Sequence, residues 1–82
     1  MQNQLDSKEL LSKYQFIVDH GRCKDGVYFY QGLHAWHDSD GYTVFVGNGV
    51  VTITLLFHGK YHADYPTQSD FNDFLAQLKK LA

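Results

Sequence analysis

The chain has 82 residues, of which 44% are hydrophobic, and its seven basic and nine acidic side chains give a formal net charge of −2. This length suits one α+β domain spanning residues 1–82, and the six Tyr, six Phe and one Trp exclude a disordered chain because they suffice for a core. The charge provides no broad basic field for phosphate backbones, which disfavours nucleic-acid partners.

The compartment is indicated by the cysteine count and by the N-terminal segment. Cys23 is the single cysteine, so an intramolecular disulfide is excluded, as suits a reducing compartment. The first six residues lack the basic and apolar segments of a secretory signal, and no apolar run approaches the roughly 18 residues that span a bilayer. We expect a cytoplasmic protein with no membrane contact.

The first predicted element is a helix from about Ser7 to His20. Asp6 is placed to cap its first turn and Glu9 to reach back toward the same turn, a variant of the capping box. Gly21 suits the end of the helix, and residues 22–26 form a polar connection. Apolar residues recur along one stripe at helical spacing: Leu10, Leu11, Tyr14, Ile17 and Val18.

Two short aromatic and β-branched runs follow, Val27–Tyr30 and Leu33–His37, with Gln31-Gly32 between them. Either this dipeptide is a tight turn between paired strands, or a single strand bends at the glycine. We favour the hairpin. The choice decides whether Tyr28 or Phe29 points at the core, because side chains alternate along a strand.

The strongest hairpin signal lies in residues 42–57, where two alternating apolar runs flank Asn48-Gly49. Asn and Gly tolerate the positive φ that a type I′ turn needs at both central residues, and this turn would place Val46 opposite Val51. Slipping by one residue would mix polar and apolar side chains on each face. The inner face would then hold Tyr42, Val44, Val46, Val51, Ile53, Leu55 and Phe57.

Loops and a second helix complete the predicted fold. A four-residue loop at 38–41 places Ala35 opposite Val44, and a loop at 58–60 leads to a last strand that ends at Pro66. A helix from about residue 69 to residue 81 follows, with Thr67 or Ser69 able to cap it. The sequence therefore predicts an α-β-β-β-β-β-α meander, an antiparallel sheet with both terminal helices packed on its inner face.

The outer face of this sheet is the predicted functional surface. Exposed aromatic residues on a sheet of threonines usually mark a binding surface for a partner. We therefore expect a non-enzymatic protein-interaction module whose partner is another protein or a second copy. Aromatic residues on a sheet can also stack the bases of single-stranded nucleic acid, but such a site needs surrounding cations that this face lacks. The candidate residues are Phe29, His34, Trp36 and Phe45, beside Val27 and Leu56.

The alternative is a small-ligand-binding domain or minor enzyme that uses the histidines near Trp36. His34 and His37 are three residues apart on a predicted strand, so they project to opposite faces and cannot easily chelate one metal together. His58 and His62 flank a turn and could converge, but two ligands make a weak site. We expect no metal and no cofactor, and the alternative would use His34, His37 and His62.

Two segments together resemble a known family. They are Gly32-Leu33-x-Ala35-Trp36-x-Asp38-x-Asp40-Gly41-Tyr42-Thr43-Val44 and Leu55-Leu56-Phe57-His58-Gly59-Lys60-Tyr61. With them the chain resembles a small uncharacterised single-domain family of Gammaproteobacteria, over nearly its whole length. The resemblance implies a bacterial cytoplasmic setting and carries no activity and no site residue.

Overall fold

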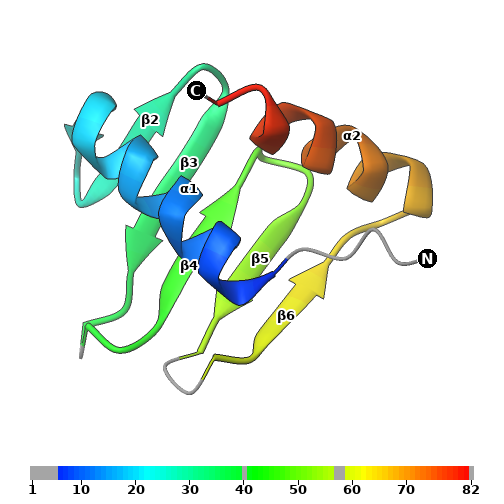
Figure 1. Cartoon of the computed structure of the whole chain (residues 1–82). Helices are drawn as coiled ribbons and strands as arrows, with labels where there is room; N and C mark the ends of the chain where they lie inside the picture. The colour runs from blue at the N-terminus through cyan, green and yellow to red at the C-terminus, as the bar shows by residue number, and fades with distance from the viewer. Residues whose placement is uncertain (1–5, 40, 57–58, 82) are drawn as a thin grey trace.

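A sheet forms one layer of the molecule and helices form the other (Figure 1). The computed structural model describes residues 6–39, 41–56 and 59–81, and within them the chain has two helices and six strands. Each strand pairs antiparallel with the next along the chain, so the sheet order is β1-β2-β3-β4-β5-β6. The elements are α1 (Ser7–His20), β1 (Arg22–Lys24), β2 (Val27–Tyr30), β3 (Leu33–His37), β4 (Val44–Gly47), β5 (Thr52–Leu55), β6 (Tyr61–Asp64) and α2 (Gln68–Lys79).

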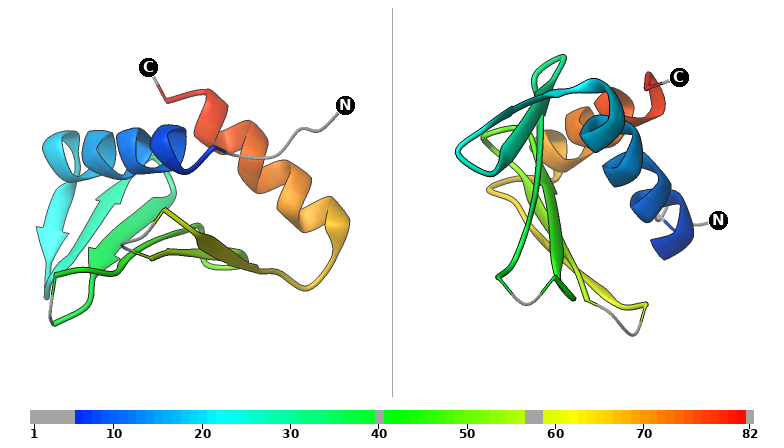
Figure 2. Two further views of the ribbon diagram at one scale, coloured as in Figure 1. Left: turned by 60° about the horizontal axis from the view of Figure 1, so that its bottom comes forward. Right: turned by 90° about the vertical axis from the view of Figure 1, so that its left-hand side faces the viewer.

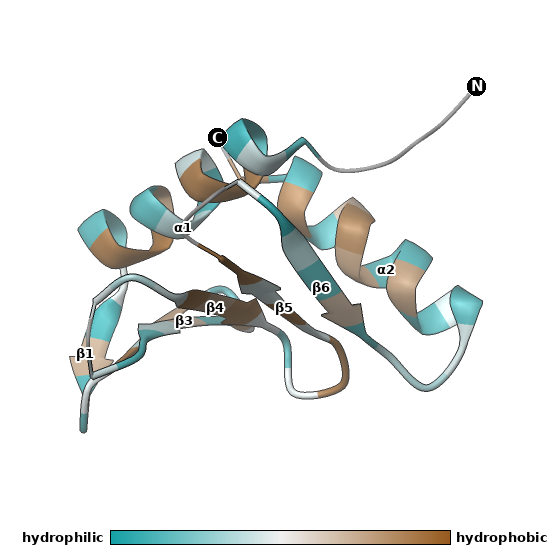
Figure 3. Cartoon of the chain, turned by 90° about the horizontal axis from the view of Figure 1, so that it is seen from below, coloured by the Kyte–Doolittle hydropathy of each residue, from teal (hydrophilic) through white to brown (hydrophobic). Residues whose placement is uncertain are grey.

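Both helices cover the same face of the sheet (Figure 2). Their apolar stripes pack on the buried residues of β3, β4 and β5. Strands β4 and β5 are the most hydrophobic in the sheet, whereas β6 is largely hydrophilic (Figure 3). This arrangement confirms the predicted fold class, an antiparallel α+β meander with the two helices on one face. The buried core consists of Leu10, Tyr14, Ile17, Leu33, Ala35, Val46, Val51, Ile53, Leu55, Phe74, Leu78 and Leu81.

The sheet has one strand more than the sequence predicts. Residues 22–26, expected to be a polar connection, form β1 and a two-residue turn in which Asp25 and Gly26 have φ of 53° and 83°. Positive φ at both positions is the type I′ geometry that joins tight hairpins. The strand was missed because all three of its residues are polar or exposed, so it carries no apolar alternation.

The hairpin at Gln31-Gly32 is confirmed, and the bent-strand alternative is wrong. Tyr30 lies opposite Leu33, and the turn residues have φ of 49° and 82°. Phe29 and its cross-strand neighbour His34 therefore lie on the face of the sheet opposite the helices. Tyr28 and Tyr30, on either side of Phe29 in β2, point toward the helices.

The predicted turn at Asn48-Gly49 is wrong in type and length. Val46 lies opposite Ile53 rather than Val51, so a four-residue loop joins β4 to β5. The β3–β4 pairing is displaced in the same way, with Ala35 opposite Val46. Both displacements amount to two residues, and an even displacement keeps every strand side chain on its predicted face.

Asn48 closes this longer loop with its side chain. Its Oδ1 accepts hydrogen bonds from the amides of Val50, at 2.9 Å, and Val51, at 2.8 Å. Its Nδ2 donates to Gln77 Oε1 of α2 at 2.7 Å. Gly47 is also required, because a Cβ there would lie 2.7 Å from the carbonyl oxygen of Val51. These contacts replace the tight turn that the dipeptide indicated.

The ends of the elements show smaller differences. α1 has the predicted bounds, and Asp6 accepts from the Lys8 amide at its start. α2 begins one residue early, because Thr67 rather than Ser69 is its cap. Tyr42, predicted on the inner face, precedes β4 and is 67% exposed. The predictions for Phe57 and His58 lie outside the described residues.

Replacing Asn48 tests the loop. Asn48→Ala removes two backbone caps and the link to Gln77, so we expect urea denaturation to show a loss of about 1–3 kcal/mol in the free energy of unfolding. Asn48→Asp is the matched control, since it keeps the acceptor for both amides and should lose less. An alanine variant as stable as the wild type would contradict this account.

A second test uses Tyr14, a core residue of α1. Burial, and next the charge of Tyr28, raise the pKa of the Tyr14 phenol above its ordinary value of 10.0. The unfolded chain therefore loses this proton first as the pH rises, so the contribution of Tyr14 to stability is complete below pH 10.0 and is lost above it. Urea denaturation from about pH 8 to pH 11 should show a steeper decline for the wild type than for Tyr14→Phe. If the free energy of unfolding declined equally with pH in the two proteins, burial would not raise the pKa of Tyr14.

Candidate functional site

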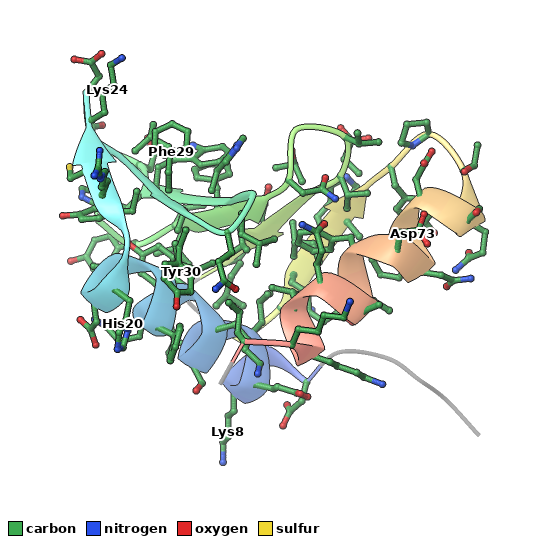
Figure 4. The ribbon with its side chains drawn as sticks, turned by 90° about the horizontal axis from the view of Figure 1, so that it is seen from above. Lys8, His20, Lys24, Phe29, Tyr30 and Asp73 are labelled. Carbon is green, nitrogen blue, oxygen red and sulfur yellow. The ribbon has the colours of Figure 1, made fainter. Side chains whose placement is uncertain are left out.

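The face of the sheet opposite the helices, called here the outer face, carries all four predicted site residues. Phe29 lies on β2, His34 and Trp36 on β3, and Phe45 on β4. Figure 4 shows Phe29 on the far side of the sheet from α1 and α2, while Tyr30 points toward α1. Among the described residues, no helix covers this face.

The four rings form two close pairs. Trp36 and Phe45 are direct cross-strand neighbours, and their rings stack nearly parallel, with centroids 5.2 Å apart and an interplanar angle of 8°. The Phe29 and His34 rings meet edge to face with centroids 4.9 Å apart. Phe29 is 41% exposed, whereas the other three are half-buried, in part by one another. Each ring therefore packs against a ring on the neighbouring strand, which restrains the side-chain conformations of both.

Two rows of cross-strand neighbours organise the outer face. The long row crosses all six strands, and the short row runs beside it across β3, β4, β5 and β6. Neighbours in a row lie directly opposite each other and share a face. The long row is Arg22, Phe29, His34, Gly47, Thr52 and Asp64; the short row is Trp36, Phe45, Thr54 and His62.

The long row carries a positive charge at one end and a negative charge at the other. Arg22 stands on edge strand β1, with Lys24 on the same face, and Asp64 stands on edge strand β6. All three side chains are exposed. None of them makes an ion pair or a side-chain hydrogen bond with another residue in the part of the chain that the structure describes. The outer face thus has a basic edge, an aromatic centre and an acidic edge.

The sequence prediction missed this basic edge. It assumed that the outer face lacks cations, and that assumption is wrong because Arg22 and Lys24 lie beside Phe29 and Val27. The signal that could have found them is Asp25-Gly26, a hairpin dipeptide set between polar residues on one side and apolar residues on the other.

The three histidines of the alternative hypothesis do not converge. His34 belongs to the long row on β3 and His62 to the short row on β6, with β4 and β5 between them. His37 lies at the exposed end of β3, where its Nδ1 is 2.8 Å from the carbonyl oxygen of Asp38. Among the described residues, no group of three or more His, Cys, Asp or Glu side chains could hold a metal.

One cavity lies on the helix side of the sheet, away from the rings. It has a volume of about 460 Å³ and is open to solvent. None of the three histidines and none of the four ring residues of the outer face lines it. Its lining includes Lys8, Leu11, Tyr42, Val44 and Leu55. The cavity therefore does not supply the histidine-lined pocket that the alternative requires.

The thiol of Cys23 also faces the helix side. Cys23 is exposed on β1 and lies opposite Tyr28. The polar interaction of the Tyr28 hydroxyl with the Cys23 side chain, and next the charge of Cys23, raise the pKa of Tyr28 above its ordinary value of 10.0. The pair belongs to the face that contains the core, so it adds no chemistry to the outer face.

Comparison with known proteins places the chain in a family without assigning an activity. No helix in the described ranges is long and apolar enough to cross a membrane. No curated protein and no solved structure matches the chain. The model of one family, described as a protein of unknown function (DUF3081), matches residues 5–82. Since the match covers nearly the whole chain, the protein belongs to the DUF3081 family.

Proposed function

We propose that this protein is a non-enzymatic interaction module that associates with a second copy of itself through the outer face of the sheet. The observation that carries the proposal is the aromatic centre of that face, where Trp36 stacks on Phe45 and no described helix covers either ring. An apolar surface of this kind, rimmed by polar residues, usually marks a contact with another protein.

The rigidity of the rings supports binding. Each ring sits on a strand whose two neighbours are hydrogen-bonded to it, and each ring also contacts another ring. Association therefore costs little side-chain entropy at these positions, and the burial of large rings is the main source of affinity in many interfaces. Phe29, the most exposed of the four, offers further apolar area at the edge of the cluster.

The placement of reactive side chains supports a role outside catalysis. Nucleophilic or acid–base catalysis needs two or three such groups within hydrogen-bond reach of one another and of a substrate. Here the ring of His34 lies against Phe29, and His37 contacts a backbone carbonyl oxygen. Cys23 is on the opposite face of the sheet from His34 and His62.

A second copy fits the face because the face is complementary to itself. Its basic edge on β1 and its acidic edge on β6 flank the same aromatic centre, so one copy can present to another both like apolar surfaces and opposite charges. The area is small. Six strands about 4.8 Å apart and four residues about 3.3 Å apart define a face of roughly 29 by 13 Å, below the standard interface size, so we expect a transient dimer with an affinity in the micromolar range or weaker.

Sedimentation and light scattering at increasing protein concentration test the proposal. The wild type should form a dimer at high concentration, up to about 1 mM, and Trp36→Ala should remain a monomer over the same range because it removes the centre of the contact. Phe29→Ala, on the same face, should weaken the dimer by a smaller amount.

Leu11→Ala is the matched control, because Leu11 is a 50% exposed apolar residue on α1, on the helix side. It should dimerise like the wild type. Circular dichroism identifies any variant that has lost its fold, and Phe29→Ala keeps the test valid should Trp36→Ala unfold. A monomeric wild type, or folded outer-face variants that dimerise normally, would overturn the proposal.

A further inference from the structure

Building on the proposed self-association, we infer that the two copies pack outer face to outer face about a two-fold axis parallel to the strands, so that Arg22 of each copy lies against Asp64 of the other. Two features of the molecule support this arrangement. They are the order of side chains along the long row and the symmetry that a pair of identical sheets must obey.

The two ends of the long row differ in charge. It begins with a cation on β1 and ends with an anion on β6, and every strand contributes one member. Arg22 and Asp64 are both exposed, and neither is ion-paired with a residue in the described ranges. Five strand spacings of about 4.8 Å separate them by roughly 24 Å, which is too far for them to neutralise each other within one copy.

A face-to-face pair of identical sheets with closed symmetry has two simple arrangements. A two-fold axis along the strands exchanges the two edges, so β1 of one copy covers β6 of the other. A two-fold axis across the strands places β1 over β1 and β6 over β6. The first arrangement brings Arg22 to Asp64 twice, whereas the second brings cation to cation and anion to anion. Like charges at an interface oppose association, so the first arrangement is favoured.

The same axis places the aromatic residues at its centre. With six strands in the sheet, an axis that exchanges the edges passes between β3 and β4. Trp36 stands on β3 and Phe45 lies directly opposite it on β4, so each Trp36 of the dimer faces Phe45 of the other copy. The interface then has a dry aromatic centre and a charged rim, the usual anatomy of a specific protein contact. The natural twist of the sheets would set their strands about 30° apart.

Charge reversal tests this arrangement. Arg22→Glu places a second carboxylate against Asp64 of the other copy, and Asp64→Arg places a second guanidinium against Arg22. Each single variant should therefore raise the dimer dissociation constant at least about 10-fold. The double variant Arg22→Glu with Asp64→Arg restores both attractive pairs and should return to within about 3-fold of the wild type.

A mixture of the two single variants gives an independent readout. Each variant alone brings like charges together at both rim contacts. In a mixed dimer, one rim contact joins the two introduced side chains and the other joins the native Arg22 and Asp64, so both contacts join opposite charges. An equimolar mixture should therefore form a mixed dimer under conditions in which either variant alone is monomeric.

Lys8→Glu is the matched control. It makes the same change of charge on α1, where Lys8 projects away from the sheet on the helix side (Figure 4), and it should dimerise like the wild type. Circular dichroism checks that each variant is folded. Added salt should weaken the wild-type dimer, since its rim contacts are exposed.

The possible results separate this inference from the proposed function. If the wild type dimerises through Trp36 but the single reversals have no effect, or if the double variant fails to recover, the arrangement is wrong while self-association stands. If the wild type stays monomeric, both fail. Weakening by each reversal together with recovery in the double variant and in the mixture would establish the arrangement.

Discussion

The alternation of side chains along six paired strands is the constraint on which the rest of the structure depends. Because successive residues point to opposite faces, each strand that contributes to the core must also present residues to the other side. The inner row of Ala35, Val46 and Ile53 is fully buried beneath the helices. The residues between them therefore form the outer face, and among these Trp36 and Phe45 are large and apolar although no described helix covers them.

Sequence reasoning recovers the faces of the sheet and the pairing of β2 with β3, but not the registers of β4 with β3 and β5, and the reason is physical. An apolar pattern with a period of two fixes which side of the sheet a residue occupies, and a displacement of two residues leaves that assignment unchanged. Loop length is decided by contacts that the pattern does not contain. At Asn48 these are two backbone amides and Gln77, which lies 29 residues later in the chain. No local rule predicts that contact.

The turn dipeptides also show that local sequence does not decide the length of a loop. Asp25-Gly26 and Gln31-Gly32 are two-residue turns with positive φ throughout, whereas Asn48-Gly49, the strongest signal by composition, is not. Apolar residues on both sides made the third turn conspicuous, whereas the polar residues before the first turn hid it. As a result, all four ring residues of the candidate site were placed correctly on the outer face, while its basic edge on β1 was missed.

On the proposed arrangement of the dimer, affinity and orientation would depend on different parts of one surface. The three residues of β1 are exposed, so this strand contributes little to the core. The rings near the centre of the outer face supply apolar area, but a centrally placed stack resists rotation about the face normal only weakly. The charges lie roughly 12 Å from the centre, half the width of the long row, so rotating one copy on the other moves them farther than it moves the rings. They therefore distinguish the arrangement that places β1 over β6 from the one that places β1 over β1. On the proposed arrangement, a strand that adds little to stability would therefore set the orientation of the dimer.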